Sequence, residues 1–175
     1  MTTAETKKFT YQDYLNTPDD ARYELIEGQL IMMTPAPTSR HQKISKEILV
    51  ILDKFVKEYN LGEIYHAPYD VVLDNENVVQ PDLVFIAKEH LHLIHEKNLQ
   101  GSPDLVIEII SESTGYRDMI QKKQLYARFG IHEYWIVIPE EASIEVYTLK
   151  DNHYEFHKKY LINDILSSPL LPPPM

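Results

Sequence analysis

The sequence contains no cysteine among its 175 residues. This absence excludes disulfide bonds, thiolate nucleophiles and zinc sites built from cysteine, and it fits a reducing compartment. Only five glycines are present, and none belongs to a phosphate-cradling loop of the Walker or dinucleotide-binding kind. No apolar run approaches membrane-spanning length, and the polar N-terminus lacks the apolar core of a signal peptide. We therefore expect a cytoplasmic protein with no membrane association.

Positive charge is also scarce, because 27 acidic residues outnumber 17 lysines and arginines and leave a formal net charge of −10. That balance argues against a protein that coats nucleic acid, which would be basic overall. It does not exclude a nuclease, since a local basic patch or a bound divalent cation can serve a phosphate. With 43% hydrophobic and 25% charged residues, the composition is typical of a soluble globular domain. We expect one domain over residues 1–175, with poorly ordered tails at 1–8 and 170–175.

Helical periodicity is clearest over residues 41–59, where apolar side chains recur on one face. Before this helix, residues 23–32 are typical of a hairpin that turns at Glu27-Gly28. After it, the pattern predicts strands at 63–73 and 81–86, followed by a polar and partly helical segment at 88–100.

An apolar strand at residues 104–110 is the centre of the predicted fold, because Leu, Val and Ile run through it without alternation. A helix over 117–129, a strand at 133–138 and a hairpin over 143–160 follow it. The order of helix, three strands, helix and strand (αβββαβ) predicts an α/β fold with one mixed β-sheet flanked by helices. Extra β-hairpins are expected at both ends.

Three polar residues occupy positions where these patterns require apolar ones. Glu108 interrupts the central strand, Asp82 stands at the head of the preceding strand, and Lys122 projects into the apolar face of the following helix. A buried carboxylate without a partner is costly, so Glu108 requires a cation, a metal ion or a raised pKa. An ion pair between Glu108 and Lys122 is the simplest interpretation, but it leaves Asp82 unexplained.

Two carboxylates and a lysine on adjacent elements suit the hydrolysis of phosphodiester bonds with a divalent metal ion. Mg²⁺ prefers oxygen ligands and usually takes one or two protein carboxylates together with waters and phosphate oxygens. The metal lowers the pKa of a bound water, and a lysine can orient that water and hold the phosphate. The sequence therefore predicts Asp82, Glu108 and Lys122 as catalytic residues and Mg²⁺ or Mn²⁺ as the cofactor.

The order of these residues resembles the PD-(D/E)XK nuclease signature, with Pro81-Asp82 followed by Glu108-Ile109-Ile110. More closely, nearly the whole chain resembles the Uma-type putative restriction endonuclease family. The matching positions are 23–28, 40–42, 80–82, 103–108, 111, 113–114, 118, 122, 126 and 130–137. Ile110 stands where the superfamily has its motif lysine, and the resemblance implies that Lys122 supplies this lysine from the following helix.

The resemblance implies a restriction-endonuclease-like core and DNA as the partner. It also implies that Asp82, Glu108 and the backbone carbonyl of Ile109 bind the metal ion. Glu24 and His41 belong to matching segments and are expected to line the same active site. For both, a structural role stays open, as a hairpin ion pair for Glu24 and as a satisfied helix-start histidine for His41.

Other signals carry less weight. A histidine-rich patch at His90, His92 and His95 is interpreted as solvated surface, because spacing alone is a weak argument for zinc. Ser111 and Ser113 are interpreted as caps of the next helix, since no Gly-x-Ser-x-Gly elbow surrounds them. A second Pro-Asp pair, at 103–104, shares a strand with the predicted ligand at 108, so the pair at 81–82 is the favoured one.

The leading functional hypothesis is an endonuclease that hydrolyses DNA phosphodiester bonds and depends on Mg²⁺ or Mn²⁺. A catalytically silent nuclease-fold protein, which binds nucleic acid or a protein partner, is the second hypothesis. A metal-dependent phosphodiesterase for small nucleotides would keep the same residues in a smaller pocket. A homodimer that pairs through the edge hairpin near residues 145–160 also stays open.

Overall fold

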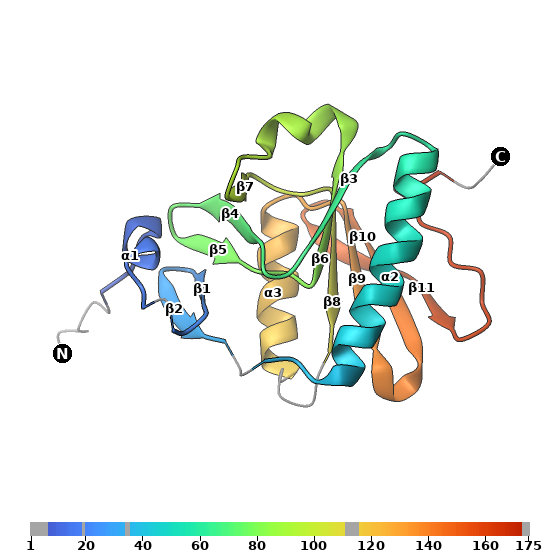
Figure 1. The fold of residues 1–175 in the computed structure, drawn as a ribbon, viewed down its shortest axis with the longest axis horizontal. Helices are drawn as coiled ribbons and strands as arrows, with labels where there is room; N and C mark the ends of the chain where they lie inside the picture. The colour runs from blue at the N-terminus through green and yellow to red at the C-terminus, as the bar shows by residue number, and fades with distance from the viewer. Residues whose placement is uncertain (1–6, 19, 34–35, 111–115, 173–175) are drawn as a thin grey trace.

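The computed structural model describes residues 7–18, 20–33, 36–110 and 116–172. The predicted tails therefore fall partly on residues 1–6 and 173–175, which lie outside the described residues, as do the predicted helix caps at 111–115. The chain begins with a short helix, α1 (Tyr11–Leu15), at one end of the molecule (Figure 1). Thr10 and Asp13 form a capping box at its start, and Tyr14 packs against the strands that follow.

The described strands form two β-sheets. The first has the strand order β2–β1–β5–β4–β7, and only β4 and β7 pair in parallel within it. Its strands are β1 (Tyr23–Ile26), β2 (Gln29–Met32), β4 (Asp70–Asp74), β5 (Asn77–Val79) and β7 (Asn98–Gln100). The predicted hairpin turn at Glu27-Gly28 is confirmed, and both residues have the positive φ that a two-residue hairpin turn favours.

The second sheet has the strand order β11–β10–β9–β8–β6–β3, and only β8 and β9 pair in parallel. Its strands are β3 (Gly62–His66), β6 (Leu83–Ala87), β8 (Leu105–Ile109), β9 (Glu133–Ile138), β10 (Ser143–Lys150) and β11 (His153–Leu161). Helix α2 (Ser39–Glu58) precedes β3, and α3 (Tyr116–Arg128) connects β8 to β9. The elements α2, β3, β6, β8, α3 and β9 thus follow the predicted αβββαβ order. Short 3₁₀ turns, η1 (Lys88–Leu93) and η2 (Pro139–Glu141), follow β6 and β9.

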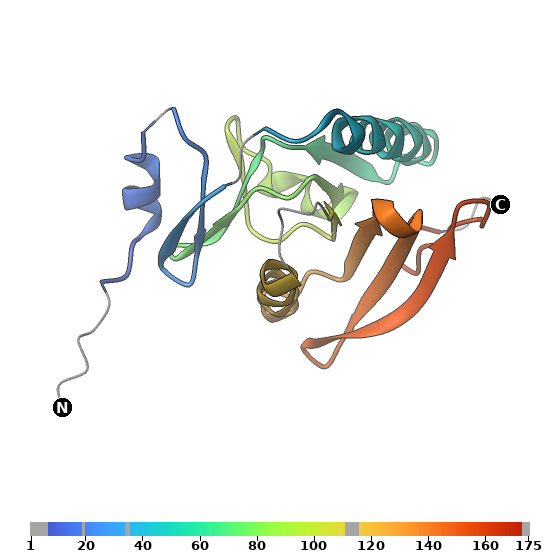
Figure 2. The same cartoon turned by 90° about the horizontal axis from the view of Figure 1, so that it is seen from below.

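The two long helices pack on opposite faces of the second sheet (Figure 2). Ile107 of β8 belongs to the apolar cluster that contains Val56 of α2. Val106, the preceding residue, belongs to the cluster that contains Tyr126 of α3. Because successive side chains of a strand point to opposite faces, Glu108 shares the α3 face with Val106. The strand that Glu108 interrupts is buried on both faces, as the apolar run predicts.

The prediction of a single sheet is wrong, because the described strands form two mixed sheets. The strand predicted over 63–73 divides into β3 and β4, which belong to different sheets. Pro68 lies between them, and its ring nitrogen carries no N–H to extend a ladder of strand hydrogen bonds. The short strand β7, inside the segment predicted as polar and partly helical, was missed because three residues are too few to show a pattern.

Candidate active site

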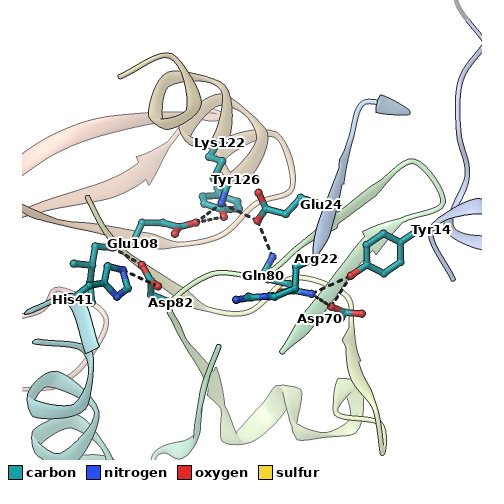
Figure 3. Close-up of polar contacts among 11 residues, drawn as sticks. Tyr14, Arg22, Glu24, His41, Asp70, Gln80, Asp82, Glu108, Lys122 and Tyr126 are labelled. Carbon is teal, nitrogen blue, oxygen red and sulfur yellow. Dashed lines mark hydrogen bonds and ion pairs between the residues drawn. The ribbon is translucent and has the colours of Figure 1, made fainter. Parts of the chain in front are cut away.

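Asp82 lies just before β6, opposite Glu108 of β8 when the antiparallel register of these strands is extended by one residue. Its Oδ2 accepts a 2.7 Å hydrogen bond from the backbone N–H of Ile109. Its Oδ1 lies 3.2 Å from Nε2 of His41, which stands in the first turn of α2 (Figure 3). Asp82 therefore has two partners in the protein itself, and an ion pair between Glu108 and Lys122 does not leave Asp82 without a role.

Lys122 projects from α3 toward Glu108, as the apolar face of the helix predicts (Figure 3). Its Nζ lies 3.1 Å from Oε1 of Glu108 and 2.8 Å from Oε1 of Glu24. Tyr126, one turn further along α3, donates a 2.7 Å hydrogen bond to the same oxygen of Glu108. The exposed fractions of these side chains are 14% for Lys122, 15% for Glu108 and 8% for Glu24. Lys122 thus joins a carboxylate of the second sheet to one of the first.

Negative charge exceeds positive charge in this buried group. Burial raises the pKa of Glu108 to about 7; Lys122 opposes the rise, and the carboxylates of Asp82 and Glu24 reinforce it. Burial alone lowers the pKa of the Lys122 ammonium, but the adjacent Glu108 and Glu24 outweigh burial and raise it. Two carboxylates therefore contact the buried ammonium of Lys122, and the carboxylate of Asp82 lies close enough to Glu108 to raise its pKa. A divalent cation would relieve that surplus of negative charge.

His41 is the second cationic partner at this place. Its hydrogen bond with Asp82 raises its pKa against the opposing effect of burial, and the backbone carbonyl of Ile109 contributes to the rise. His41 therefore faces both the carboxylate and the carbonyl that the sequence resemblance implies as metal ligands. Its Nδ1 is buried and has no hydrogen-bond partner within the described residues.

The predicted site residues meet at one cavity of about 280 Å³. Its lining contains all five predicted side chains, Glu24, His41, Asp82, Glu108 and Lys122. Ile109, whose backbone carbonyl is a predicted metal ligand, lines it as well. Apolar residues also line the cavity, among them Ile31, Met32, Met33, Ala36 and Pro37. Residues from both sheets and both long helices therefore contribute to a single hollow.

The donor atoms at the cavity are of the type that Mg²⁺ and Mn²⁺ prefer. Asp82 and Glu108 supply carboxylate oxygens, and Ile109 supplies a carbonyl oxygen. No three histidine, aspartate or glutamate side chains of the described chain are arranged to share one metal ion. Because Mg²⁺ usually takes one or two protein carboxylates and completes its shell with water, the donor set fits this ion. A bound metal ion would replace His41 as the partner of Asp82 and Lys122 as the partner of Glu108.

Two polar contributors were missed by the sequence reasoning. Tyr126 lies one turn after Lys122 on α3, and its hydroxyl donates a hydrogen bond to Glu108 that its apolar ring does not indicate. Gln80 was noted only as the neighbour of the Pro-Asp pair, although its backbone N–H donates a 2.9 Å hydrogen bond to Glu24. A tyrosine one turn after an inward lysine is a signal that could have indicated the first contact, whereas nothing local indicates the second.

The second Pro-Asp pair serves a different part of the fold. Asp104 lies at the opposite end of β8 from Glu108 and accepts a 2.7 Å hydrogen bond from the backbone N–H of Ala87. Nδ1 of His90 lies 2.9 Å from Oδ1 of Asp104, and Nδ1 of His132 lies 3.5 Å from the same oxygen. His90 was expected to be a solvated surface residue, but its ring contacts the buried carboxylate of Asp104.

Comparison with known protein families identifies a family for the chain. The family described as "Uma2: Putative restriction endonuclease" matches residues 10–174. The chain belongs to the Uma2 family. The crystal structure of "a putative nuclease belonging to DUF820" from Anabaena variabilis ATCC 29413 is similar to this Uma2-family protein. The match has a TM-score of 0.75 and 20% sequence identity, and it covers 95% of this chain and 89% of that one.

At 20% identity, this structural likeness establishes a shared fold and no more. No curated protein matches the chain. Among the helices that the structure describes, none is both long and apolar enough to cross a membrane. Family membership and the geometry of the cavity are therefore the observations on which a function is argued for this Uma2-family protein.

Proposed function

We propose that this Uma2-family protein is an endonuclease that hydrolyses DNA phosphodiester bonds with Mg²⁺ or Mn²⁺. The observation that carries the proposal is the meeting of three charged side chains at one cavity: Asp82 just before β6, Glu108 of β8, and Lys122 of α3. Membership of the family described as "Putative restriction endonuclease" supports it. The proposal includes a restriction-endonuclease-like core formed by α2, β3, β6, β8, α3 and β9.

Each residue has a distinct role in this proposal. Asp82, Glu108 and the carbonyl of Ile109 hold the metal ion through hard oxygen atoms. A bound Mg²⁺ would supply Lewis acidity toward a phosphate oxygen and lower the pKa of a water. Lys122, which the adjacent carboxylates keep protonated, stabilises negative charge that develops on the phosphate. Tyr126 holds Glu108 in place through its hydrogen bond.

A nuclease-fold protein without catalysis is the second candidate. It is favoured by the contacts of the protein itself, because Glu108 already has Lys122 as a partner and Asp82 already has His41. The formal net charge of −10 also opposes the approach of DNA. The two candidates differ in one measurable property, which is the cutting of phosphodiester bonds.

Cleavage assays on supercoiled plasmid and on single-stranded DNA, each with Mg²⁺ or Mn²⁺, test the proposal. The wild-type protein should cut, and a chelator should stop it. Asp82→Ala, Glu108→Ala and Lys122→Ala should each lower the rate by about 10²–10³-fold, the typical effect of removing a group that stabilises transition-state charge.

Lys123→Ala is the matched control, because Lys123 lies next to Lys122 on α3 but places its Nζ 3.3 Å from the centroid of the Tyr147 ring. This variant should cut at the wild-type rate. Equal cutting by the wild type and by Asp82→Ala would contradict the proposal and indicate a contaminating nuclease. Metal-independent DNA binding without any cutting would support the second candidate.

A further inference from the structure

Lys122 has two carboxylate partners, and only one of them is a proposed metal ligand. Its Nζ lies 3.1 Å from Glu108 and 2.8 Å from Glu24. If Glu108 coordinates a divalent cation, its charge is shared with that cation, and Glu24 becomes the remaining anionic partner of the lysine. Glu24 comes from β1 of the first sheet, and its side chain is close to fully buried.

Glu24 is itself held by Gln80, two residues before Asp82 in the chain. The backbone N–H of Gln80 donates a 2.9 Å hydrogen bond to Oε1 of Glu24, the oxygen that also faces Lys122 (Figure 3). The side-chain amide of Gln80 donates to Asp70 over 2.7 Å and to the hydroxyl of Tyr14 over 3.2 Å. One residue therefore connects the carboxylate beside Lys122 to two elements of the N-terminal half.

The acceptor atom of the same side chain is also occupied. Arg22 donates from Nε and Nη2 to Oε1 of Gln80, over 3.0 Å and 2.5 Å. Both polar atoms of the Gln80 side chain are hydrogen-bonded, so the side chain is restricted to one orientation. These bonds hold the residue in place while its backbone N–H donates to Glu24. A glutamine fixed in this way is suited to holding a buried carboxylate still.

We propose that Glu24 and Gln80 are positioning residues of the site: Gln80 fixes Glu24, and Glu24 holds Lys122 at the cavity when Glu108 coordinates a divalent cation. This inference rests on the proposed function. Without Glu24, the lysine would keep no anionic partner in a largely buried place, which is costly, and it would turn away from the cavity. A purely structural ion pair would affect folding and leave turnover per folded molecule unchanged.

Steady-state cleavage by Glu24→Gln is the first test, because this substitution keeps the shape of the side chain and removes its charge. The turnover number should fall by about 10- to 100-fold, the usual effect of removing a group that orients an active-site ligand. The KM for DNA should stay within a few-fold of the wild-type value. Glu24→Asp, which keeps the charge, should restore part of the loss.

A double-mutant cycle with Lys122→Met separates positioning from stability. If Glu24 acts through Lys122, adding Glu24→Gln to Lys122→Met should not lower the turnover number further. Multiplicative losses in the double variant would overturn the inference. Gln80→Met, which keeps the backbone N–H and loses the amide, should give a smaller loss in the same direction. Activities are normalised to the folded fraction measured by circular dichroism.

A second readout does not depend on cleavage. Reductive methylation followed by mass spectrometry reports how accessible the Lys122 ammonium is, with Lys123 on the same helix as an internal reference. In the wild type, Lys122 should stay protected with and without Mn²⁺. In Glu24→Gln, Mn²⁺ should increase its labelling relative to Lys123.

The two readouts keep the two proposals apart. If the wild type does not cut, the proposed function fails, and the labelling of Lys122 alone decides the inference. Protection of Lys122 in Glu24→Gln with Mn²⁺ would then overturn it. If the wild type cuts and Glu24→Gln retains full turnover, the inference is overturned while the nuclease proposal stands.

Discussion

At the level of single residues, the cavity is characterised by an imbalance of charge. Glu24, Asp82 and Glu108 bring three carboxyl groups together, and Lys122 is their one buried ammonium in the described part of the chain. His41 adds a second partner only when it is protonated. Burial, reinforced by the carboxylates of Asp82 and Glu24, raises the pKa of Glu108, so this residue keeps its proton to a higher pH than an exposed glutamate does.

The free energy of unfolding of the metal-free protein should respond to this proton. The folded state holds the proton of Glu108 more tightly than the unfolded chain does, because the pKa rises from 4.5 to about 7 on folding. The stabilising contribution is therefore complete below pH 4.5 and is lost as the pH rises to about 7. At about 1.4 kcal/mol for each pH unit, the loss is on the order of 3 kcal/mol.

Urea denaturation in the presence of a chelator, at a series of pH values, measures this effect. Glu108→Gln has no proton to lose at this position, so its stability should fall less over the same pH range. The difference between the two curves isolates Glu108 from the other titrating groups, including His41. Parallel curves for the wild type and the variant would contradict the raised pKa.

At the level of elements, the site depends on the close pairing of β3 with β6, the strand that follows Asp82. Gly62 starts β3 and pairs with Ala87. A Cβ atom at Gly62 would lie 2.0 Å from the backbone oxygen of Ile86, far inside van der Waals contact. No rotamer change relieves a clash with backbone, so this position accepts only glycine.

Gly62→Ala should therefore lower the free energy of unfolding by about 3 kcal/mol, the upper end of the usual cost of overpacking. Gly130→Ala is the matched control, because nothing lies within 4 Å of the position of its Cβ. In that variant an alanine must adopt the positive φ of Gly130, which lowers the free energy of unfolding by about 1–2 kcal/mol. Chemical denaturation of both variants checks this. A smaller loss for Gly62→Ala than for Gly130→Ala would show that β3 moves to make room.

At the level of the whole molecule, the candidate site lies where the two sheets meet (Figure 2). Val71 and Val79 of the first sheet belong to the same apolar cluster as Val84 and Val106 of the second. The sheets therefore share one core. Because Glu24 comes from one sheet and the proposed metal ligands Glu108 and Ile109 come from the other, the cavity is complete only when both sheets are docked.

A bound cation should consequently stabilise the whole fold. At a free Mg²⁺ concentration 100 times its dissociation constant, the free energy of unfolding should rise by about 2.7 kcal/mol. Thermal denaturation with and without Mg²⁺ measures this rise. Asp82→Asn should abolish it, whereas Asp53→Asn, an exposed-face change on α2, should leave it unchanged.

Ionic strength must be matched with NaCl in this experiment, because screening alone stabilises a chain with a formal net charge of −10. Equal stabilisation by Mg²⁺ and by NaCl at the same ionic strength would contradict a specific metal site. A rise that persists in Asp82→Asn would place any bound Mg²⁺ elsewhere on the surface.

The sequence by itself predicted the order of the core elements (αβββαβ) and the inward direction of Glu108 and Lys122. The period of an α-helix and the alternation of a strand are properties of the local backbone, so the chain around Glu108 and Lys122 shows where both side chains point. The structure confirms that orientation, with 3.1 Å between their charged atoms. The same local patterns predicted the hairpin at 23–32 and both long helices.

Only the tertiary structure decided how distant segments share the polar atoms of the site. Lys122 meets Glu24 across 98 residues of sequence, and Gln80 meets Glu24 across 56. The division into two sheets likewise depends on which strands pair, and each strand shows only its own alternation. Such contacts are set by the packing of the whole chain, and no local period records them. For that reason Glu108 could be identified from sequence, whereas the second partner of Lys122 required the fold.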